Sequence, residues 1–338
     1  MNETSNPILV ETIRGDSPET IHRGSFSVVD AHGKVVMAAG ETDAPVFPRS
    51  GLKPIQALAL CETGAAKAFG LGHANIALAC ASHDGDPTHT EIIENWLDKI
   101  GCNSNDLVCN PRLPVAQEDK KTLTHPKEKL TALHDPCSGK HAGFLTIAKH
   151  LRHPILGYNR MDHPVQQRVI GIIEQMTGLD LFETPKAMDG SGVPTLGIPL
   201  GNVSLAMARL SNPHDQPDDR KAACNRVLKA MSMEPFLVAG KGRFSTRVLE
   251  ALGPVCIVKS GGEGIYCGTL IKRRLGIAIK IDDGSRIAAE TVMISLLQKL
   301  KILTEGALGR LLNLIEPPIF SRSGEVVGVV KPKHPALK

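Results

Sequence analysis

The two ends of this 338-residue chain carry short runs of apolar and β-branched residues that are typical of β-strands. Near the N-terminus, SFSVVDAHGKVVMAA contains two β-rich runs around the turn residues Asp30 to Gly33, which predicts a hairpin. In the C-terminal third, VCIVKSGGEG, IYCGTLI and LGIAIKI are rich in isoleucine and valine and are separated by glycines or basic residues. This pattern predicts an antiparallel meander, followed by a helix from about Ser285 to Leu300.

The middle of the chain has the three- to four-residue spacing of apolar positions that favours helices. The segment PTHTEIIENWLDKIG predicts a helix whose first turn pairs Thr88 with Glu91 in a capping box. DHPVQQRVIGIIEQMTG predicts a second helix, with Asp162 near its start and Gly178 at its end. The apolar run ANIALACA is instead interpreted as a strand.

Strands at both ends with helices between them favour an α+β fold. We expect the N- and C-terminal segments to pair in one antiparallel sheet that is packed with helices. No stretch of the sequence marks a boundary between independently folding parts, so residues 1–338 are expected to form a single domain.

Composition narrows the classes of function. The net charge of +4 is small for this length, and with 3% aromatic residues the chain has few platforms on which single-stranded nucleic acid stacks. No apolar run approaches a bilayer span, the N-terminus lacks a signal peptide, and the eight cysteines form no C-x-x-C pair. SGGEG lacks the spacing of a dinucleotide or phosphate loop. The sequence therefore predicts a cytoplasmic protein without a nucleic-acid partner, a membrane partner or a nucleotide cofactor.

The segment FPRSGLKPIQALAL places Ser50 and Lys53 three residues apart where a helix, expected to run to about Ala68, begins. Pro54 fits only the first turn of that helix, because it has no amide hydrogen to donate. The simplest interpretation is that Ser50 caps the helix and Lys53 is solvated. The alternative is catalytic, because a serine hydroxyl becomes a nucleophile when a base such as a neutral lysine amine removes its proton.

Two further segments favour the catalytic alternative. CASHDGD places Ser82, His83 and Asp84 in a loop, and VKSGGEG places Lys259 at the end of a strand before glycines that allow close approach. A serine–lysine pair, a second serine in a loop and a lysine-serine-glycine strand end occur in this order in serine β-lactamases and penicillin-binding proteins. The three segments together indicate a serine hydrolase.

A fourth segment, HDPCSGKHAGFL, adds the most specific pattern, and FPRSGLKP, ASHDGD, MDGSGVPT, VAGKGRFSTRV, VKSGGEG and GIAIKIDDG accompany it. Together these segments resemble the rhizobial-type L-asparaginases, the asparaginase II family, from about residue 7 to beyond residue 290. The resemblance implies a serine β-lactamase-like fold, a homodimer, and hydrolysis of L-asparagine to L-aspartate and ammonia.

Carried over by position, the resemblance implies that Ser50 pairs with Lys53 and that Ser82 lies close to Lys259. Either serine is a candidate for attack on the side-chain amide through an acyl-enzyme, and our interpretation favours Ser50. The charged groups of the substrate need partners, for which the expected residues are Arg49, His83, Asp84, His141 and Asp189.

The resemblance also implies a zinc ion, held by a cysteine and a lysine of DPCSGKH and by a second cysteine from an Asp-Gly-Cys segment. Cys137 and Lys140 are present, but the second segment ends in Ser191. A serine hydroxyl is a poorer zinc ligand than a thiolate. Three alternatives follow. Zinc is bound weakly, with Asp189 or a histidine as a further ligand; the site is empty, and Cys137 and Lys140 contact only substrate; or the protein is a metal-free variant. We favour weakened or absent zinc.

Two other functions remain open from the sequence. A penicillin-binding-type acyltransferase or esterase would use the same serine–lysine pairs, although its cell-wall substrates lie outside the cytoplasm. A non-catalytic protein that binds an amino acid would keep the pocket without turnover, and Ser191 is the residue that suggests it.

Overall fold

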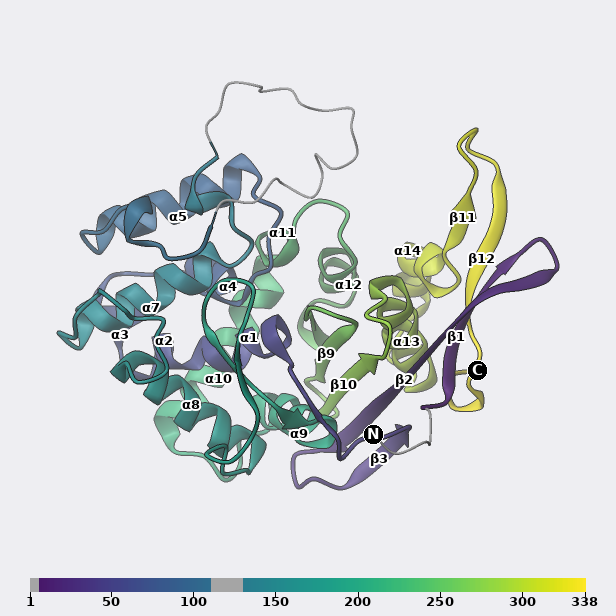
Figure 1. The fold of residues 1–338 in the computed structure, drawn as a ribbon, viewed down its shortest axis with the longest axis horizontal. Coiled ribbons are helices and arrows are strands. Elements are labelled where there is room, and N and C mark those ends of the chain that lie inside the picture. Colours follow the sequence, from purple (N-terminus) through teal and green to yellow (C-terminus); the bar gives the residue numbers. More distant parts are fainter. Residues whose placement is uncertain (1–5, 111–129) are drawn as a thin grey trace. The chain divides into compact units, whose positions relative to one another are not determined.

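The structure is a computed structural model that describes residues 6–110 and 130–338. The chain forms two compact units, both drawn in Figure 1. Unit 1 consists of Met1–Leu52, Gly197–Asn212 and Arg247–Lys338, and unit 2 consists of Lys53–Leu196 and Pro213–Thr246. The expectation of a single domain over the whole chain stays a prediction.

Unit 1 is built around an eight-stranded antiparallel sheet in the order β11-β12-β1-β2-β10-β9-β8, with β3 paired to β2. Its strands are β1 (Ile8–Arg14), β2 (Ser17–Asp30), β3 (Val35–Ala39), β8 (Cys256–Ser260), β9 (Ile265–Leu270), β10 (Leu275–Ile281), β11 (Pro318–Phe320) and β12 (Val326–Pro332). The N-terminal strands lie between two groups of C-terminal strands in this order, so the predicted sheet, hairpin and meander are confirmed. The sequence had not predicted β1, β11 and β12.

Helices pack on both faces of this sheet. In β10, a side chain at Gly276 would lie 1.9 Å from the backbone oxygen of Ser204, so only glycine lets α9 (Leu200–Ser211) approach so closely. In β9, a side chain at Gly268 would instead meet Met293 of α13 (Arg286–Lys299). Gly268 is paired with Ile277, the neighbour of Gly276. Neighbouring strand positions face opposite sides, so α9 and α13 cover opposite faces.

The remaining elements of unit 1 are short or peripheral. They are the strand pair β4 (Pro45–Val46) and β7 (Ile198–Pro199), the C-terminal part of α12 (Phe244–Leu252), α14 (Glu305–Ile315), and the 3₁₀ turns η1 (Arg49–Leu52), η4 (Gly253–Val255) and η5 (Pro335–Leu337). The helix expected from about Ser285 is confirmed as α13, and the hydroxyl of Ser285 caps it.

Unit 2 is mainly helical. Its helices are α1 (Lys53–Gln56), α2 (Leu58–Glu62), α3 (Ala65–Ala68), α4 (His73–Cys80), α5 (Pro87–Lys99), α7 (Ser138–His150), α8 (Pro164–Thr177), α10 (Asp218–Met233) and α11 (Pro235–Ala239). Two 3₁₀ turns, η2 (Ser104–Asp106) and η3 (Ala132–His134), and the strand pair β5 (Lys186–Met188) and β6 (Pro194–Leu196) complete it.

The strand expected at ANIALACA is wrong, because this run forms helix α4. Its residues from Asn75 to Cys80 are all buried, since α5, α7, α10 and α11 pack around it. A helix that is covered on every side has no polar face, so its sequence lacks the period that distinguishes it from a buried strand. At Gly139 of α7, a side chain would lie 2.3 Å from the backbone oxygen of Leu78, which explains how closely α4 and α7 pack.

Helix starts also differ from the prediction. The single helix expected from Ser50 to Ala68 is divided into α1, α2 and α3, and Gly64 adopts a left-handed backbone with φ of 78° before the last of them. The capping box of Thr88 and Glu91 is wrong, because Asp86 caps α5 by accepting from the amide of Thr88. The helix α8 ends at Gly178 as expected.

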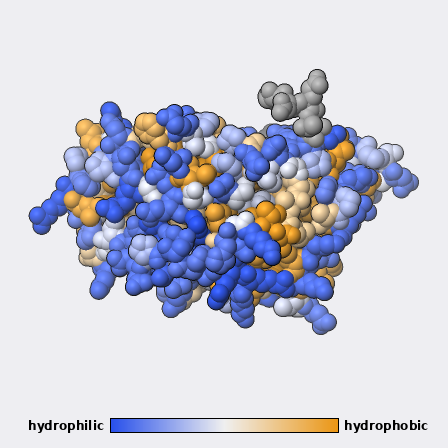
Figure 2. All heavy atoms as spheres, turned by 90° about the horizontal axis from the view of Figure 1, so that it is seen from below, coloured by the Kyte–Doolittle hydropathy of each residue, from blue (hydrophilic) through white to orange (hydrophobic). Residues whose placement is uncertain are grey.

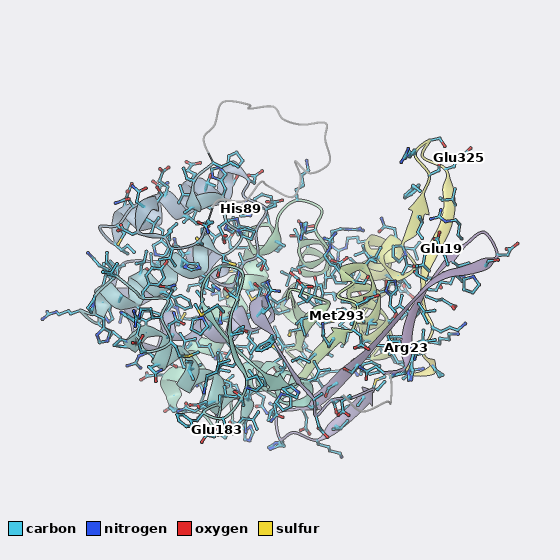
Figure 3. The ribbon with its side chains drawn as sticks, viewed as in Figure 1. Glu19, Arg23, His89, Glu183, Met293 and Glu325 are labelled. Carbon is cyan, nitrogen blue, oxygen red and sulfur yellow. The ribbon has the colours of Figure 1, made fainter. Side chains whose placement is uncertain are left out.

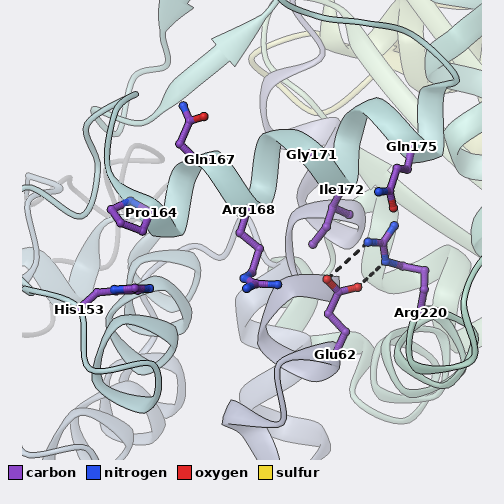
Figure 4. Close-up of a pocket in the computed structure, with 9 residues that line it drawn as sticks. All are labelled: Glu62, His153, Pro164, Gln167, Arg168, Gly171, Ile172, Gln175 and Arg220. Carbon is purple, nitrogen blue, oxygen red and sulfur yellow. Dashed lines mark hydrogen bonds and ion pairs between the residues drawn. The ribbon is translucent and has the colours of Figure 1, made fainter.

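A cleft of about 380 Å³ lies beside α8 in unit 2 (Figure 4). An ion pair between Glu62 and Arg220, both largely buried, lines it and joins α2 to α10. Polar and charged side chains cover most of the molecular face in Figure 2, with smaller hydrophobic areas among them. Among the described residues, helices long and apolar enough to cross a membrane do not occur.

Candidate functional site

In unit 1, the candidate residue Ser50 lies in the 3₁₀ turn η1, which packs against β8 and β9. Ser50 is half-buried, and its hydroxyl makes no hydrogen bond with the described residues, so it does not act as a helix cap. The preceding residue, Arg49, has a φ of 46°, a backbone conformation that residues other than glycine rarely adopt. Strain of this kind is often kept where a side chain must be held in one direction.

Lys259 belongs to the same unit and lies at the end of β8. It is almost completely buried, and its amine donates to the carbonyl of Ser260 at 2.7 Å. The glycines that follow form the turn to β9, and a side chain at Gly262 would lie 2.7 Å from the guanidinium of Arg49. Arg49 also lies 3.4 Å from the exposed carboxylate of Glu263. The glycine-rich turn therefore holds the Arg49 side chain in place.

In unit 2 the central group is Lys53, the first residue of α1, whose side chain is fully buried. Its Nζ contacts the carbonyl oxygen of Ala81, the hydroxyl of Ser82 at 3.3 Å and the carbonyl of Pro136 at 3.4 Å. Among the residues that the structure describes, it forms no ion pair with a carboxylate. The structure thus brings Lys53 to Ser82, the serine at the end of α4.

The loop Ser82–Gly85, here called the Ser82 loop, continues from this contact. The amide of Gly85 donates to Nδ1 of His83 at 3.2 Å, so the ring proton is on Nε2, which donates to the hydroxyl of Ser138 at 2.9 Å. Burial lowers the pKa of His83 well below its usual value. His83 is therefore a neutral ring that ties the loop to α7.

Lys140, one turn into α7, is buried and has a carboxylate partner. Its Nζ lies 2.7 Å from Oδ2 of Asp189 and 2.9 Å from the hydroxyl of Ser191. The other carboxylate oxygen of Asp189 accepts from the hydroxyl and amide of Ser191 and from the amide of Val193. Burial alone raises the pKa of Asp189, but the charge of Lys140 and these hydrogen bonds outweigh it and hold the pKa well below its usual value.

His141 follows Lys140 on α7 and is fully buried. The hydroxyl of Tyr158 accepts from the amide of Val108 at 3.1 Å and lies 2.7 Å from Nδ1 of His141, its only other hydrogen-bond partner among the described residues, so we assign its proton to this contact. Burial raises the pKa of Tyr158, which keeps that proton in place. Nε2 of His141 consequently carries the ring proton, and it has no acceptor among the described residues. A buried donor of this kind is suited to an oxygen atom of a ligand.

The residues near Lys140 do not fit a zinc ion. Tetrahedral zinc needs four donors, and lysine donates to a metal only after losing its proton. Here the amine of Lys140 is bound to a carboxylate and a hydroxyl, and Ser191 donates to Asp189. Within residues 6–110 and 130–338, histidine, cysteine, aspartate and glutamate side chains form no cluster of three that would hold a metal. Cys137, at the start of α7, adds one thiol.

The sequence missed three residues that hold the site together: His89, Ser138 and Tyr158. Ser138 lies inside the HDPCSGKHAGFL signature and His89 follows the SHDGD loop, so both were close to recognised segments. Tyr158 lies 17 residues beyond His141, and its contact with that residue depends on tertiary packing.

Comparison with known proteins identifies the family. A sequence profile described as L-asparaginase II matches residues 10–332, nearly the whole chain. This match indicates a hydrolase. The chain belongs to the L-asparaginase II family, which confirms the resemblance found in its segments. The search of curated proteins gives no match.

Similar solved structures include two β-lactamases. One, from Mycobacterium bovis, is 11% identical with a TM-score of 0.38, and the match covers 86% of this chain and 95% of that one. A putative β-lactamase from Bacteroides dorei is 14% identical with a TM-score of 0.41, covering 76% and 84%. A simvastatin synthase mutant from Aspergillus terreus is 10% identical with a TM-score of 0.34, covering 77% and 86%. The family assignment rests on the sequence profile alone.

Proposed function

We propose that this protein hydrolyses L-asparagine to L-aspartate and ammonia, with Ser50 as the nucleophile and Lys53 as the base. The observation that carries the role of Lys53 is its environment: a buried amine that contacts the hydroxyl of Ser82 and two carbonyl oxygens. The choice of Ser50 as the nucleophile comes from the sequence. Membership of the L-asparaginase II family supports the substrate. A homodimer, a cytoplasmic location and weakened zinc binding stay predictions from the sequence.

Lys53 acts as a base only in its neutral form. A neutral amine has two N–H groups and one lone pair. Nζ of Lys53 donates to the carbonyls of Ala81 and Pro136 and to the hydroxyl of Ser82 at 3.3 Å. After loss of one proton, two N–H groups remain for the carbonyls and the lone pair faces the hydroxyl of Ser82. In this form Lys53 accepts a proton from a serine and returns it to the leaving ammonia.

The balanced reaction has two halves. Ser50 Oγ forms a bond to the amide carbon, its proton passes to Lys53, and the carbon–nitrogen bond breaks as that proton reaches the departing ammonia. Water then attacks the resulting ester, gives its proton to Lys53 and releases aspartate, while the serine regains its proton. We propose that backbone amides and the lysines donate hydrogen bonds to the oxyanion that forms in each half of the reaction. Ser82 and Lys259 are the second serine–lysine pair of this proposal.

Substrate recognition uses the charged groups around this chemistry. We propose that Asp189 binds the α-amino group and Arg49 the α-carboxylate. The Nε2 proton of His141 is directed to an oxygen of the substrate, because it is a buried donor without an acceptor among the described residues. His83 and Asp84 are the remaining residues that the sequence proposed as substrate contacts.

Ser82 is a second candidate for the nucleophile. The specific observation in its favour is the 3.3 Å contact with Lys53, because a nucleophile and its base must lie within hydrogen-bond reach. If Ser50 is the nucleophile, its proton reaches Lys53 through the hydroxyl of Ser82.

The experiment is to quench the reaction during turnover and locate the acylated serine by peptide mass spectrometry. The proposal predicts an aspartyl ester on Ser50 that is absent from Ser50→Ala and still present in the exposed control Ser323→Ala. An ester on Ser82 would exchange the roles of the two serines. Labelling of Ser50 by a fluorescent penicillin without ammonia release would favour an acyltransferase. Asparagine binding in calorimetry without turnover would favour a binding protein.

A further inference from the structure

The Ser82 loop is held at three points by three different helices. The amide of Ser82 donates to the carbonyl of Val238 in α11 at 3.0 Å, and His83 donates to Ser138 of α7. The third attachment is Asp84, whose carboxyl oxygen Oδ1 lies 3.4 Å from Nδ1 of His89 in the first turns of α5. The sequence proposes Asp84 as a substrate contact, but its side chain is turned to this buried histidine.

His89 is enclosed among the helices of unit 2, and Figure 3 marks its position. Its ring is fully buried between the rings of His83 and Phe236, with centroids 4.9 and 4.8 Å away. Nε2 lies 3.3 Å from the carbonyl of Phe236, which can only accept, so the proton of the neutral ring is on Nε2. Nδ1 therefore presents its lone pair to Asp84.

Asp84 is as tightly enclosed as its partner. Its side chain fits against Gly240, where a side chain would lie 2.1 Å from Oδ2 of Asp84. Oδ1 of Asp84 and Nδ1 of His89 are both buried, have no hydrogen-bond partner among the described residues, and face each other at 3.4 Å. An ionised carboxylate facing the lone pair of a neutral ring would be repulsive, whereas a proton between the two atoms would satisfy both.

The surroundings decide where that proton lies. Burial raises the pKa of Asp84, against the lowering effect of His89 and of nearby backbone amides, and burial lowers the pKa of His89. The other titratable groups near the pair are Asp86 and the neutral His83, with Lys53 beyond His83. Both buried groups are thus favoured in their neutral forms, a carboxylic acid and an imidazole.

We propose that Asp84 is a positioning residue: as a neutral carboxylic acid it donates to Nδ1 of His89, and this hydrogen bond fixes the loop that presents Ser82 to Lys53. The Nε2 proton of His89 is donated to the carbonyl of Phe236, so this residue also helps to fix the loop. The kinetic test of this inference rests on the proposed function, whereas the hydrogen bond itself does not.

The substitutions Asp84→Asn and Asp84→Ala distinguish a positioning role of Asp84 from a contact between its charge and the substrate. The amide of Asp84→Asn still donates to Nδ1, so kcat should stay within about threefold of the wild type, whereas Asp84→Ala should lower kcat about 100-fold with KM unchanged. His89→Phe keeps the stacked ring but removes the acceptor, and it should match Asp84→Ala. The control Asp86→Asn removes a neighbouring charge that caps α5 and should leave kcat unchanged.

Equal losses in Asp84→Asn and Asp84→Ala, or an increase in KM with kcat retained, would overturn the proposal. Should the alanine or phenylalanine variant fail to fold, Asp84→Asn alone still decides between the two roles.

A measurement without substrate keeps the inference independent of the reaction. Nitrogen-15 NMR of the histidine rings, with the His89 signals assigned from His89→Phe, should show a neutral ring protonated on Nε2 at neutral pH. A doubly protonated His89 would overturn the neutral pair. If the wild-type protein releases no ammonia from asparagine, the proposed function fails, yet this spectrum still confirms or refutes the hydrogen bond.

Discussion

Unit 2 contains two buried lysines, Lys53 and Lys140, whose amines have different kinds of partner. Lys140 is bound to the carboxylate of Asp189 at 2.7 Å, and this ion pair stabilises its charge. Lys53 is equally buried but faces carbonyl oxygens and a hydroxyl. One lysine is held by a carboxylate and the other contacts a serine hydroxyl, and this difference motivates the proposal that Lys53 is the base.

The largest expected effect follows from Lys53→Met, which keeps the length of the side chain and removes the amine. Loss of a general base should lower kcat for ammonia release by about 10²- to 10⁴-fold, with the fold retained by circular dichroism. Lys67→Met, at a lysine of α3, provides the matched control. If Lys53→Met kept more than a tenth of the wild-type activity, another residue would have to be the base.

Lys140→Met should instead act mainly on stability. It leaves the buried carboxylate of Asp189 without its charge partner, a change that lowers the free energy of unfolding by about 3–5 kcal/mol. Urea unfolding measures the loss. Glu62→Gln breaks the other buried ion pair of unit 2, with Arg220, and should lower stability without lowering kcat. If Lys140→Met were as stable as the wild type, the ion pair would not be the function of that lysine.

The pH dependence of stability tests the ion pair between Asp189 and Lys140. The pKa of Asp189 is held below its usual value in the folded protein, so the unfolded chain takes up a proton first as the pH falls. The stabilisation by Asp189 is complete above the unfolded carboxyl pKa of about 3.9 and is lost as the pH decreases further. Urea midpoints from pH 7 to pH 3 should therefore fall more steeply for the wild type than for Asp189→Asn. Parallel curves would contradict the ion pair.

Ser191→Cys gives the smallest expected effect on turnover. The wild type should lose no activity to a chelator, because Lys140, Asp189 and Ser191 bind one another. The cysteine variant restores the second thiol that the resemblance implies and should retain zinc after gel filtration, as measured by elemental analysis. Equal zinc in both proteins would show that Ser191 does not determine metal binding.

The sequence predicted the sheet and the site segments better than the details that make the site work. The hairpin at Asp30 and the meander after Cys256 are local patterns with clear turn signals, and both are confirmed. Helix α4 was misjudged because burial on all sides removes its amphipathic period.

The candidate site was found as segments, because residues such as Ser50 and Lys53 are neighbours along the chain. Contacts between distant segments could not be found in this way. The hydrogen bond of Tyr158 to His141 and the bond of Lys140 to Ser191 join segments that only the fold brings together. His89 was missed because a histidine in a helical turn has many ordinary roles, and only its burial against Asp84 distinguishes it.

The most direct test of the account is ammonia release from L-asparagine by the purified protein, measured beside Ser50→Ala with and without chelator. The account predicts release by the wild type that the chelator does not change and that the Ser50→Ala variant lacks. A folded wild-type protein that releases no ammonia under any of these conditions would contradict it.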